Sequence, residues 1–180
     1  MIVAWREPRG GIYKKSRTKI VCDTQHEPTE MNLFLKQIPD GAKALEIGMG
    51  RGGFHLELLK KFHHVTSVEI DTRQAYVFYH GLTNKTRSTI VVGDSNDRDV
   101  IAEVSYYGPF NFLFIDGDHE CQSVLNDWGI YSPMVRIGGI VAFHDTNAPH
   151  WLPGPRQAIG MITKNWNHLG NVWGYSWYTL

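Results

Sequence analysis

The sequence lacks the features that mark a secreted or a membrane protein. It has two cysteines, Cys22 and Cys121, and no C-x-x-C motif, so we expect reduced thiols and a cytoplasmic location. No apolar run approaches the ~20 residues that a membrane helix needs. The first residues show no apolar segment followed by a cleavage site. We therefore expect no membrane contact and no signal peptide.

The sequence also lacks a net charge, an internal repeat and a low-complexity segment. Lys plus Arg and Asp plus Glu each number 18. This balance gives no global field that would attract nucleic acid, although it leaves a local patch open. We expect no nucleic-acid partner. The 180 residues, 42% of them hydrophobic, suffice for one domain with a substantial core.

The N-terminal segment differs from the rest of the chain in its charge. Six Lys and Arg side chains fall within residues 1–19, with two glycines between them. Basic segments of this kind are solvated faces or interaction arms, so both a solvated tail and a lid over a substrate stay open. We expect an N-terminal arm over residues 1–22 and a single domain over residues 23–180.

The apolar pattern of the domain predicts alternating helices and strands. An amphipathic helix is indicated by Met31, Phe34, Leu35 and Ile38, with Pro28 in its first turn. Strands are then expected at residues 43–47, 65–70, 89–92, 111–115 and 140–143. Helices are expected at residues 54–62, 72–80, 97–105, 124 to about 133, and 156–166. This alternation predicts the α/β class, with a single Rossmann-like doubly wound sheet that is mostly parallel.

Two further local expectations come from the same pattern. The aromatic-rich end, residues 167–180, is expected to close the sheet as an antiparallel strand or hairpin, with its turn at Gly170 and Asn171. Such an end is more typical of strands than of a surface that stacks nucleic-acid bases. His63 and His64 are expected in a surface turn after the helix at residues 54–62.

A glycine loop is the main functional signal. Residues 44–53 read Ala-Leu-Glu-Ile-Gly-Met-Gly-Arg-Gly-Gly, which predicts a buried strand, a glycine turn and the start of a helix. The spacing matches the G-x-G-x-x-G loops of several nucleotide-binding folds. Glu46, at the mouth of the strand, would repel the pyrophosphate of a dinucleotide. It would attract the ammonium and sulfonium of S-adenosylmethionine, so we expect a site for that cofactor.

Polar side chains lie at or just after the end of each of the five predicted strands, where ligands bind in open parallel sheets. Glu69 lies 21 positions after Gly48, near the ~20-residue offset of an acid that binds ribose hydroxyls. Asp94 is placed to accept from an adenine amino group. The last two strands end in Asp-Gly-Asp-His (116–119) and His-Asp-Thr-Asn (144–147). Any single acid has an alternative role as a helix cap, but caps do not require five polar strand ends in register.

These motifs resemble those of class I S-adenosylmethionine-dependent methyltransferases over residues 25–147. The segments Phe-Ile-Asp-Gly-Asp-His and Gly-Gly-Ile-Val-Ala-Phe-His-Asp are similar to the branch of antibiotic sugar O-methyltransferases and cephalosporin-hydroxylase-like proteins. The resemblance implies a cofactor site in the glycine loop and at the strand ends, with Gln25 over the cofactor. The cofactor-binding residues it implies are Gln25, Glu46, Gly48, Met49, Gly50, Glu69, Ile70, Gly93, Asp94, Ser95 and Asp116.

The same resemblance implies a divalent ion beside the cofactor. Its ligands would be Asp116 and Asp145, with His144 where relatives often have an acid, and His119 would act as the base together with Asp116. Two carboxylates suit Mg²⁺, whereas an imidazole favours Mn²⁺, Fe²⁺ or Zn²⁺. Without a metal, His144 would orient substrate or hydrogen-bond Asp116. His119 has an alternative role in bracing the following helix.

Three functions stay open at this point. The first is methyl transfer to a hydroxyl of a small molecule, because a base or a metal makes a hydroxyl a better nucleophile. The second is a NAD-dependent oxidoreductase, which the glycine spacing and Glu69 also fit. The third is a cofactor-binding subunit without methyl transfer of its own. A homo-oligomer is a further possibility that the resemblance suggests.

Overall fold

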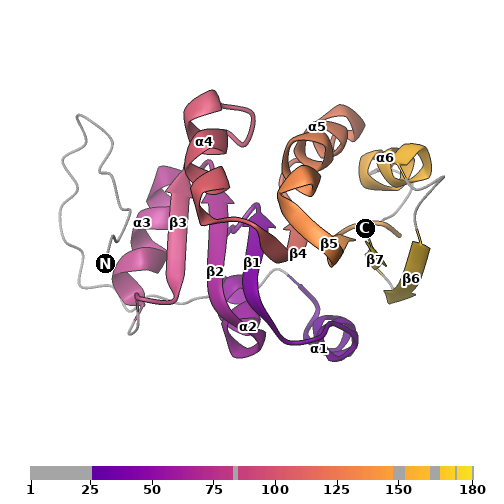
Figure 1. Cartoon of the computed structure of the whole chain (residues 1–180), viewed down its shortest axis with the longest axis horizontal. Coiled ribbons are helices and arrows are strands. Elements are labelled where there is room, and N and C mark those ends of the chain that lie inside the picture. Colours follow the sequence, from indigo (N-terminus) through magenta and orange to yellow (C-terminus); the bar gives the residue numbers. More distant parts are fainter. Residues whose placement is uncertain (1–25, 83–84, 148–152, 163–166, 173, 180) are drawn as a thin grey trace.

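The described part of the chain forms one seven-stranded sheet with helices on both faces (Figure 1). The computed structural model describes residues 26–82, 85–147, 153–162, 167–172 and 174–179. The helices are α1 (Pro28–Gln37), α2 (Gly53–Lys61), α3 (Thr72–Gly81), α4 (Arg98–Tyr107), α5 (Cys121–Tyr131), the 3₁₀ turn η1 (Ser132–Met134) and α6 (Gly154–Ile162). The strands are β1 (Gly41–Ile47), β2 (Phe62–Glu69), β3 (Ser88–Val92), β4 (Phe110–Ile115), β5 (Val135–Phe143), β6 (Asn167–Val172) and β7 (Tyr175–Thr179).

The strand order is β3-β2-β1-β4-β5-β7-β6. The five strands from β3 to β5 pair in parallel, and β7 pairs antiparallel with both β5 and β6. This confirms the expected α/β fold with a mostly parallel sheet and a C-terminal hairpin. The chain order reverses between β1 and β4, the point where open sheets of this kind bind ligands. None of the described helices is long and apolar enough to cross a membrane.

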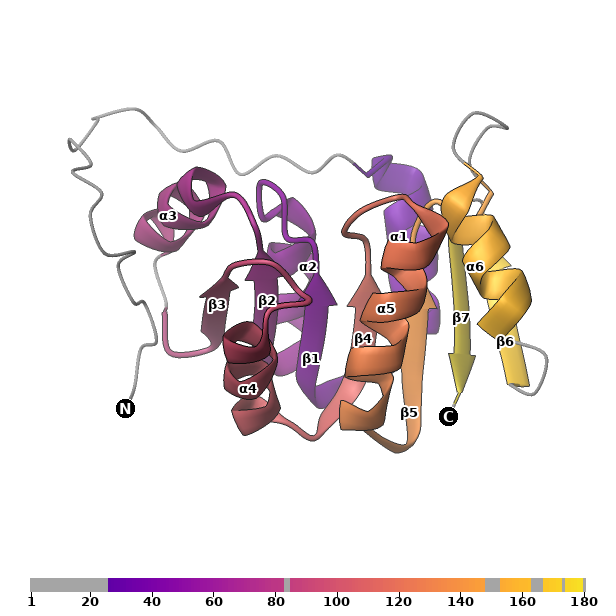
Figure 2. The same cartoon turned by 90° about the horizontal axis from the view of Figure 1, so that it is seen from above.

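The core has two layers, because α4, α5 and α6 lie on one face of the sheet and α1 and α2 on the other (Figure 2). Leu45 and Ile47 pack with α4, α5 and α6 on one face of the sheet. Ala44 packs on the opposite face, against α1 and α2. Because successive side chains of a strand point to opposite faces, Glu46 lies on the same face as Ala44. This placement decides where its carboxylate can act.

The turn of the C-terminal hairpin differs from the expectation. β6 continues to Val172, so Gly170 and Asn171 lie inside the strand, and the connection falls after them. A Cβ on Gly170 would come within 2.6 Å of the Trp177 indole. Glycine is therefore required there by a close side-chain contact rather than by a turn.

The expected surface turn at His63 and His64 is also wrong. α2 ends at Lys61 and β2 begins at the next residue, so both histidines belong to the strand. His64 makes a hydrogen bond of 2.9 Å with Thr89 of β3. No glycine or proline separates the helix from the strand, which leaves little sequence signal for their boundary.

The first prediction concerns the aromatic core beneath the site. Phe34 is fully buried and its ring stacks on that of Tyr175 with centroids 4.4 Å apart. We expect Phe34→Ala to lower the free energy of unfolding by about 3–5 kcal/mol, because it leaves a cavity in a packed layer. Urea denaturation measures this change. The matched control is Leu33→Ala at a 42% exposed neighbour, expected to change stability by about 0.5 kcal/mol or less; equal losses would contradict the packing described here.

Candidate functional site

A cavity of about 740 Å³ opens at the carboxyl ends of the parallel strands. Its volume falls within the range of about 300–1,000 Å³ that is usual for small-molecule and cofactor sites. Nearly all of the sequence-predicted residues line it. These are Gly48, Met49, Gly50, Glu69, Ile70, Gly93, Asp94, Ser95, Asp116, His119, His144 and Asp145. Glu46 does not line it, and Gln25, like the arm over residues 1–22, lies outside the described residues.

The glycine loop passes very close to the end of β4. Gly48 has a φ of +86°, and a Cβ there would lie 2.1 Å from the carbonyl oxygen of Asp116. No residue with a side chain fits this approach. The loop is also tied to β2, because the amides of Gly48 and Met49 donate to the carbonyl oxygen of Val68 at 3.0 and 3.3 Å. The backbone of the loop therefore forms one wall of the cavity, beside Asp116.

The carboxylate of Glu69 holds this loop from the end of β2. It accepts hydrogen bonds from the amides of Gly50 at 2.6 Å and Asp71 at 2.7 Å. Burial raises the pKa of Glu69, and the two amide bonds oppose that rise. Each carboxylate oxygen can accept more than one hydrogen bond, so Glu69 can bind ligand hydroxyls while it orders the loop.

Glu46 is not at the mouth of the cavity, which corrects the sequence-based expectation. Its side chain is 1% exposed and accepts a hydrogen bond from the Ser67 hydroxyl, 3.5 Å from His55 Nδ1. Burial raises the pKa of Glu46 to about 8, so it is largely neutral at pH 7. The alternation of β1 turns it under α2, and the expected direct attraction to a cationic cofactor is therefore not available.

Asp127 lines the cavity but was not singled out from the sequence. It is 2% exposed on α5 and accepts a hydrogen bond of 2.6 Å from the Ser95 hydroxyl. Tyr131, one turn further, donates to the carbonyl oxygen of Ser95 at 2.6 Å. A signal did exist, because Asp127 lies three residues after Val124 on the inward stripe of the helix, where an acid is unexpected.

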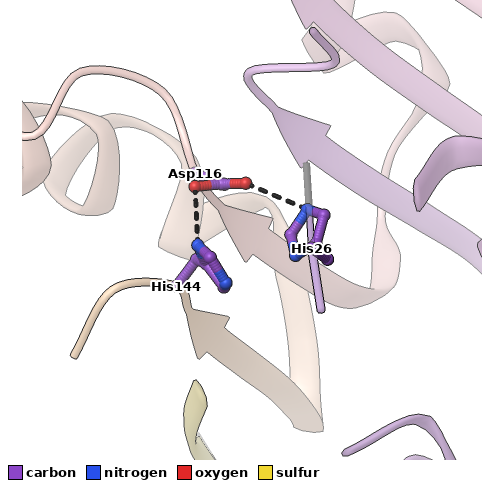
Figure 3. A group of neighbouring side chains, drawn as sticks. All are labelled: His26, Asp116 and His144. Carbon is purple, nitrogen blue, oxygen red and sulfur yellow. Dashed lines mark ion pairs between the residues drawn. The ribbon is translucent and has the colours of Figure 1, made fainter. Parts of the chain in front are cut away.

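Asp116, at the end of β4, is surrounded by three histidines. His26 Nε2 and His144 Nδ1 each lie 3.3 Å from a different oxygen of its carboxylate (Figure 3). His119 Nε2 is 3.9 Å from Asp116 and 2.7 Å from Asp145 Oδ2. His144 Nδ1 is also 3.3 Å from Asp145 Oδ2. The structure thus brings the predicted residues of β4 and β5 into one cluster.

The charges of this cluster reinforce one another. Burial alone would raise the pKa of Asp116, but His144 and His26 outweigh it and lower that pKa. Burial alone would lower the pKa of His144, but the two carboxylates raise it to about 10. The hydrogen bond to Asp145 raises the pKa of His119. Both carboxylates are therefore ionised at neutral pH, and the His144 imidazole carries positive charge beside them.

His26 is the member of this cluster that is not among the predicted site residues. It precedes α1, is 8% exposed, and its Nδ1 forms a hydrogen bond with the Tyr175 hydroxyl of β7. Its ring stacks on Phe54 with centroids 4.8 Å apart. No motif surrounds His26, and its contact with Tyr175 spans 149 positions of the chain. Only the tertiary structure places it beside Asp116.

The ligand atoms of the cluster fit a divalent cation. Among the described residues, two groups of three have ligand atoms within 4.8 Å of one another: His26, Asp116 and His144, and Asp116, His119 and Asp145. Asp116 belongs to both. The predicted set of Asp116, His144 and Asp145 is divided between them. Mixed imidazole and carboxylate donors are typical ligands of Mn²⁺, Fe²⁺ and Zn²⁺.

The chain belongs to the protein family described as Methyltransferase domain, whose model matches residues 45–146. This stretch runs from within β1 to just past the end of β5 and includes the described site except His26. The match confirms the expected class, the methyltransferases.

Solved structures of this class share the fold. The chain is similar to the O-methyltransferase from Bacillus cereus in complex with SAH, with a TM-score of 0.66, 18% identity, and coverage of 87% of this chain and 83% of that one. It is similar to TomG from Streptomyces achromogenes in complex with SAM, with a TM-score of 0.62, 16% identity, and coverage of 87% and 79%. The methyltransferase MycE of the mycinamycin pathway, in complex with Mg and SAH, gives a TM-score of 0.57 and 20% identity. That similarity covers 84% of this chain and 48% of MycE.

One curated protein shares a segment of sequence. Uncharacterized protein R132 of Acanthamoeba polyphaga mimivirus is 40% identical over 55 residues, which is 31% of this chain. The matched segment spans 25% of the length of that relative. The likeness therefore covers one part of each protein.

The second prediction concerns Asp127. Burial raises its pKa from the ordinary 3.8 to about 6, so the folded protein holds this proton more tightly than the unfolded chain. The stability that the proton provides is complete below about pH 4 and is lost as the pH rises through about 6. Since asparagine cannot ionise, we expect Asp127→Asn to gain stability relative to the parent protein between pH 4 and pH 8, by up to about 3 kcal/mol.

Urea denaturation at a series of pH values measures this gain. The matched control is Asp99→Asn on the exposed side of α4, whose effect should change little with pH. A difference between Asp127→Asn and the parent that is constant from pH 4 to pH 8 would show that Asp127 ionises normally.

Proposed function

We propose that this protein transfers the methyl group of S-adenosylmethionine to a hydroxyl group of a small molecule. The observation that carries the proposal is that one cavity holds both the glycine loop with Glu69 and the cluster around Asp116. A cofactor site and a base thus face the same space. Methyl transfer needs an in-line approach of nucleophile and methyl group, and a shared cavity makes that approach available.

The cofactor would lie along the glycine loop from β1 to β3. Glu69 would accept from the ribose hydroxyls, with Ile70 beside it, since ribose-binding acids stand at this place in related sheets. Gly93, Asp94 and Ser95 would face the adenine. The remainder of the cofactor would be lined by Gly48, Met49, Gly50 and Asp116. We also propose that Gln25, which is outside the described residues, lies over the cofactor.

His119 would be the general base. Its Nε2 lies 2.7 Å from Asp145 Oδ2, and its side chain is 40% exposed toward the cavity. A carboxylate in this position orients the imidazole and stabilises the charge that it gains with a proton. Asp116 adds a second negative charge 3.9 Å away. The base would act on an acceptor hydroxyl in the exposed part of the cavity.

A divalent ion would add to this chemistry. Asp116, which belongs to both groups of ligand atoms, would be its central ligand, with His144 and Asp145 as the predicted partners. Mg²⁺ or Mn²⁺ bound there would supply positive charge that lowers the pKa of an acceptor hydroxyl. With or without the ion, the side chains of this chain would hold and orient the acceptor.

The other two functions gain less support. The family match favours a methyltransferase over a NAD-dependent oxidoreductase. A cofactor-binding subunit without turnover would have the same cavity, so only a measurement of methyl transfer distinguishes it from the enzyme.

We also propose that residues 1–22 form an arm beside a single domain over residues 23–180.

The third prediction tests the cofactor site by calorimetric titration with S-adenosylhomocysteine. We expect micromolar binding by the parent protein, and none of NAD. Glu69→Gln should weaken binding about 10–100-fold, because a hydrogen bond to a charged group contributes about 1.5–3 kcal/mol. The matched control is Glu57→Gln on α2, whose partner is Lys60 at 2.6 Å and which does not line the cavity. Binding of NAD without S-adenosylhomocysteine would overturn the assignment of this site.

The fourth prediction tests the base. Transfer of a labelled methyl group to a panel of small hydroxyl compounds should fall about 10²–10⁴-fold in His119→Ala, the usual contribution of a general base. Binding of S-adenosylhomocysteine should stay within about threefold of the parent. His63→Ala, at an exposed position of β2, is the control. Cofactor binding by the parent with no transfer to any acceptor would favour the non-catalytic subunit.

A further inference from the structure

We propose that His26, Asp116 and His144 form a metal site that takes a first-row transition ion, such as Zn²⁺ or Fe²⁺, in preference to Mg²⁺. The proposal rests on the proposed function only for the place of this ion in the reaction cavity. The ligand atoms themselves are a property of the fold. The three residues come from the segment before α1, the end of β4 and the end of β5 (Figure 3).

The arrangement of the three side chains suits one ion. The two imidazoles bracket a single carboxylate, each 3.3 Å from its own oxygen. The three ligand atoms lie within 4.8 Å of one another, a spacing that one ion could bridge with small side-chain movements. All three residues line the cavity, so coordination positions on that side would stay open to small ligands.

The environment of His26 is that of a metal ligand. Its Nδ1 forms a hydrogen bond with the hydroxyl of Tyr175, which is fully buried. Ligating histidines usually engage their second ring nitrogen with an oxygen in this way, which sets the tautomer and the ring orientation. Nε2 is then directed toward Asp116. Stacking against Phe54, with centroids 4.8 Å apart, keeps the ring in place.

The donor set decides which ion is preferred. Mg²⁺ binds oxygen ligands and retains its waters, whereas two imidazoles and one carboxylate are a usual set for Zn²⁺ and for Fe²⁺ with open positions. The other group, with Asp116, His119 and Asp145, has two carboxylates and one imidazole. His26 and His119 each belong to one group alone. Substituting them separately therefore distinguishes the two positions.

The fifth prediction is made for the 180-residue chain after treatment with a chelator. Calorimetric titration should show Zn²⁺ binding at least about 100-fold tighter than Mg²⁺ binding. His26→Ala should weaken Zn²⁺ binding at least about 10-fold, whereas His119→Ala should change it less than about threefold. Co²⁺ serves as a spectroscopic probe, and its visible absorption bands should change in His26→Ala and persist in His119→Ala.

A second variant keeps the proposal testable if His26→Ala does not fold. Tyr175→Phe removes only the hydroxyl that orients His26 and retains the ring, and we expect it to weaken Zn²⁺ binding about 10-fold. Far-ultraviolet circular dichroism checks the fold of each variant. Unchanged Zn²⁺ affinity in both His26→Ala and Tyr175→Phe would overturn the proposal.

The remaining outcomes separate this proposal from the proposed function. Loss of Zn²⁺ binding in His119→Ala but not in His26→Ala would place the ion at the other group and overturn the inference. Binding of S-adenosylhomocysteine without any Zn²⁺ binding by the parent would overturn the metal site and leave the methyltransferase assignment standing. Zn²⁺ binding that depends on His26, in a protein that does not bind S-adenosylhomocysteine, would support the site and count against the proposed function.

Discussion

The close passage of the glycine loop over the end of β4 is the contact on which the site depends. Because Gly48 has no side chain, β1 can continue past the carbonyl of Asp116, where a Cβ would lie 2.1 Å from that oxygen. Backbone hydrogen bonds extend the ladder across the same edge, from Asp116 to Ile47 at 2.9 Å and from His144 to Ile115 at 3.1 Å. The glycine loop and the charged cluster are therefore held side by side.

Strand alternation then decides which polar groups face the cavity. Asp116 and His144 immediately follow β4 and β5, where the chain leaves the sheet and side chains reach the cavity. Glu46, one residue before the end of β1, points into the layer under α2 instead. Burial keeps that acid largely neutral, whereas the paired acids of the cavity are held ionised by their histidines. Glu46 and Asp116, both near the glycine loop, thus differ in charge, because Glu46 is largely neutral and Asp116 is negative.

Much of the fold and site was predictable from local pattern. The alternation of helices with apolar strands predicted the parallel sheet. Glu69, Asp94 and Asp116 lie at or just after the ends of their strands, which placed them at one edge of the sheet. The expected turn at Gly170 was wrong, because glycine there relieves a contact with Trp177 from another strand. A contact between strands leaves no mark within a short sequence window. Asp127 lies on the inward stripe of its helix, but its hydrogen-bond partner Ser95 is 32 positions away, in the loop after β3.

The sequence by itself determined the class of fold, the glycine loop and the set of polar strand ends, because these depend on the order and spacing of neighbouring residues. Only the tertiary structure decided that His26 joins Asp116 and that Glu46 does not face the cavity. The first depends on α1 and β7, which are far apart in the chain, because Tyr175 and Trp177 of β7 point to the face of the sheet that α1 covers. The second depends on strand alternation, because Leu45 and Ile47 face one side of the sheet and Glu46, between them, faces the layer under α2. Both are consequences of how the layers assemble, which spacing along the chain does not encode.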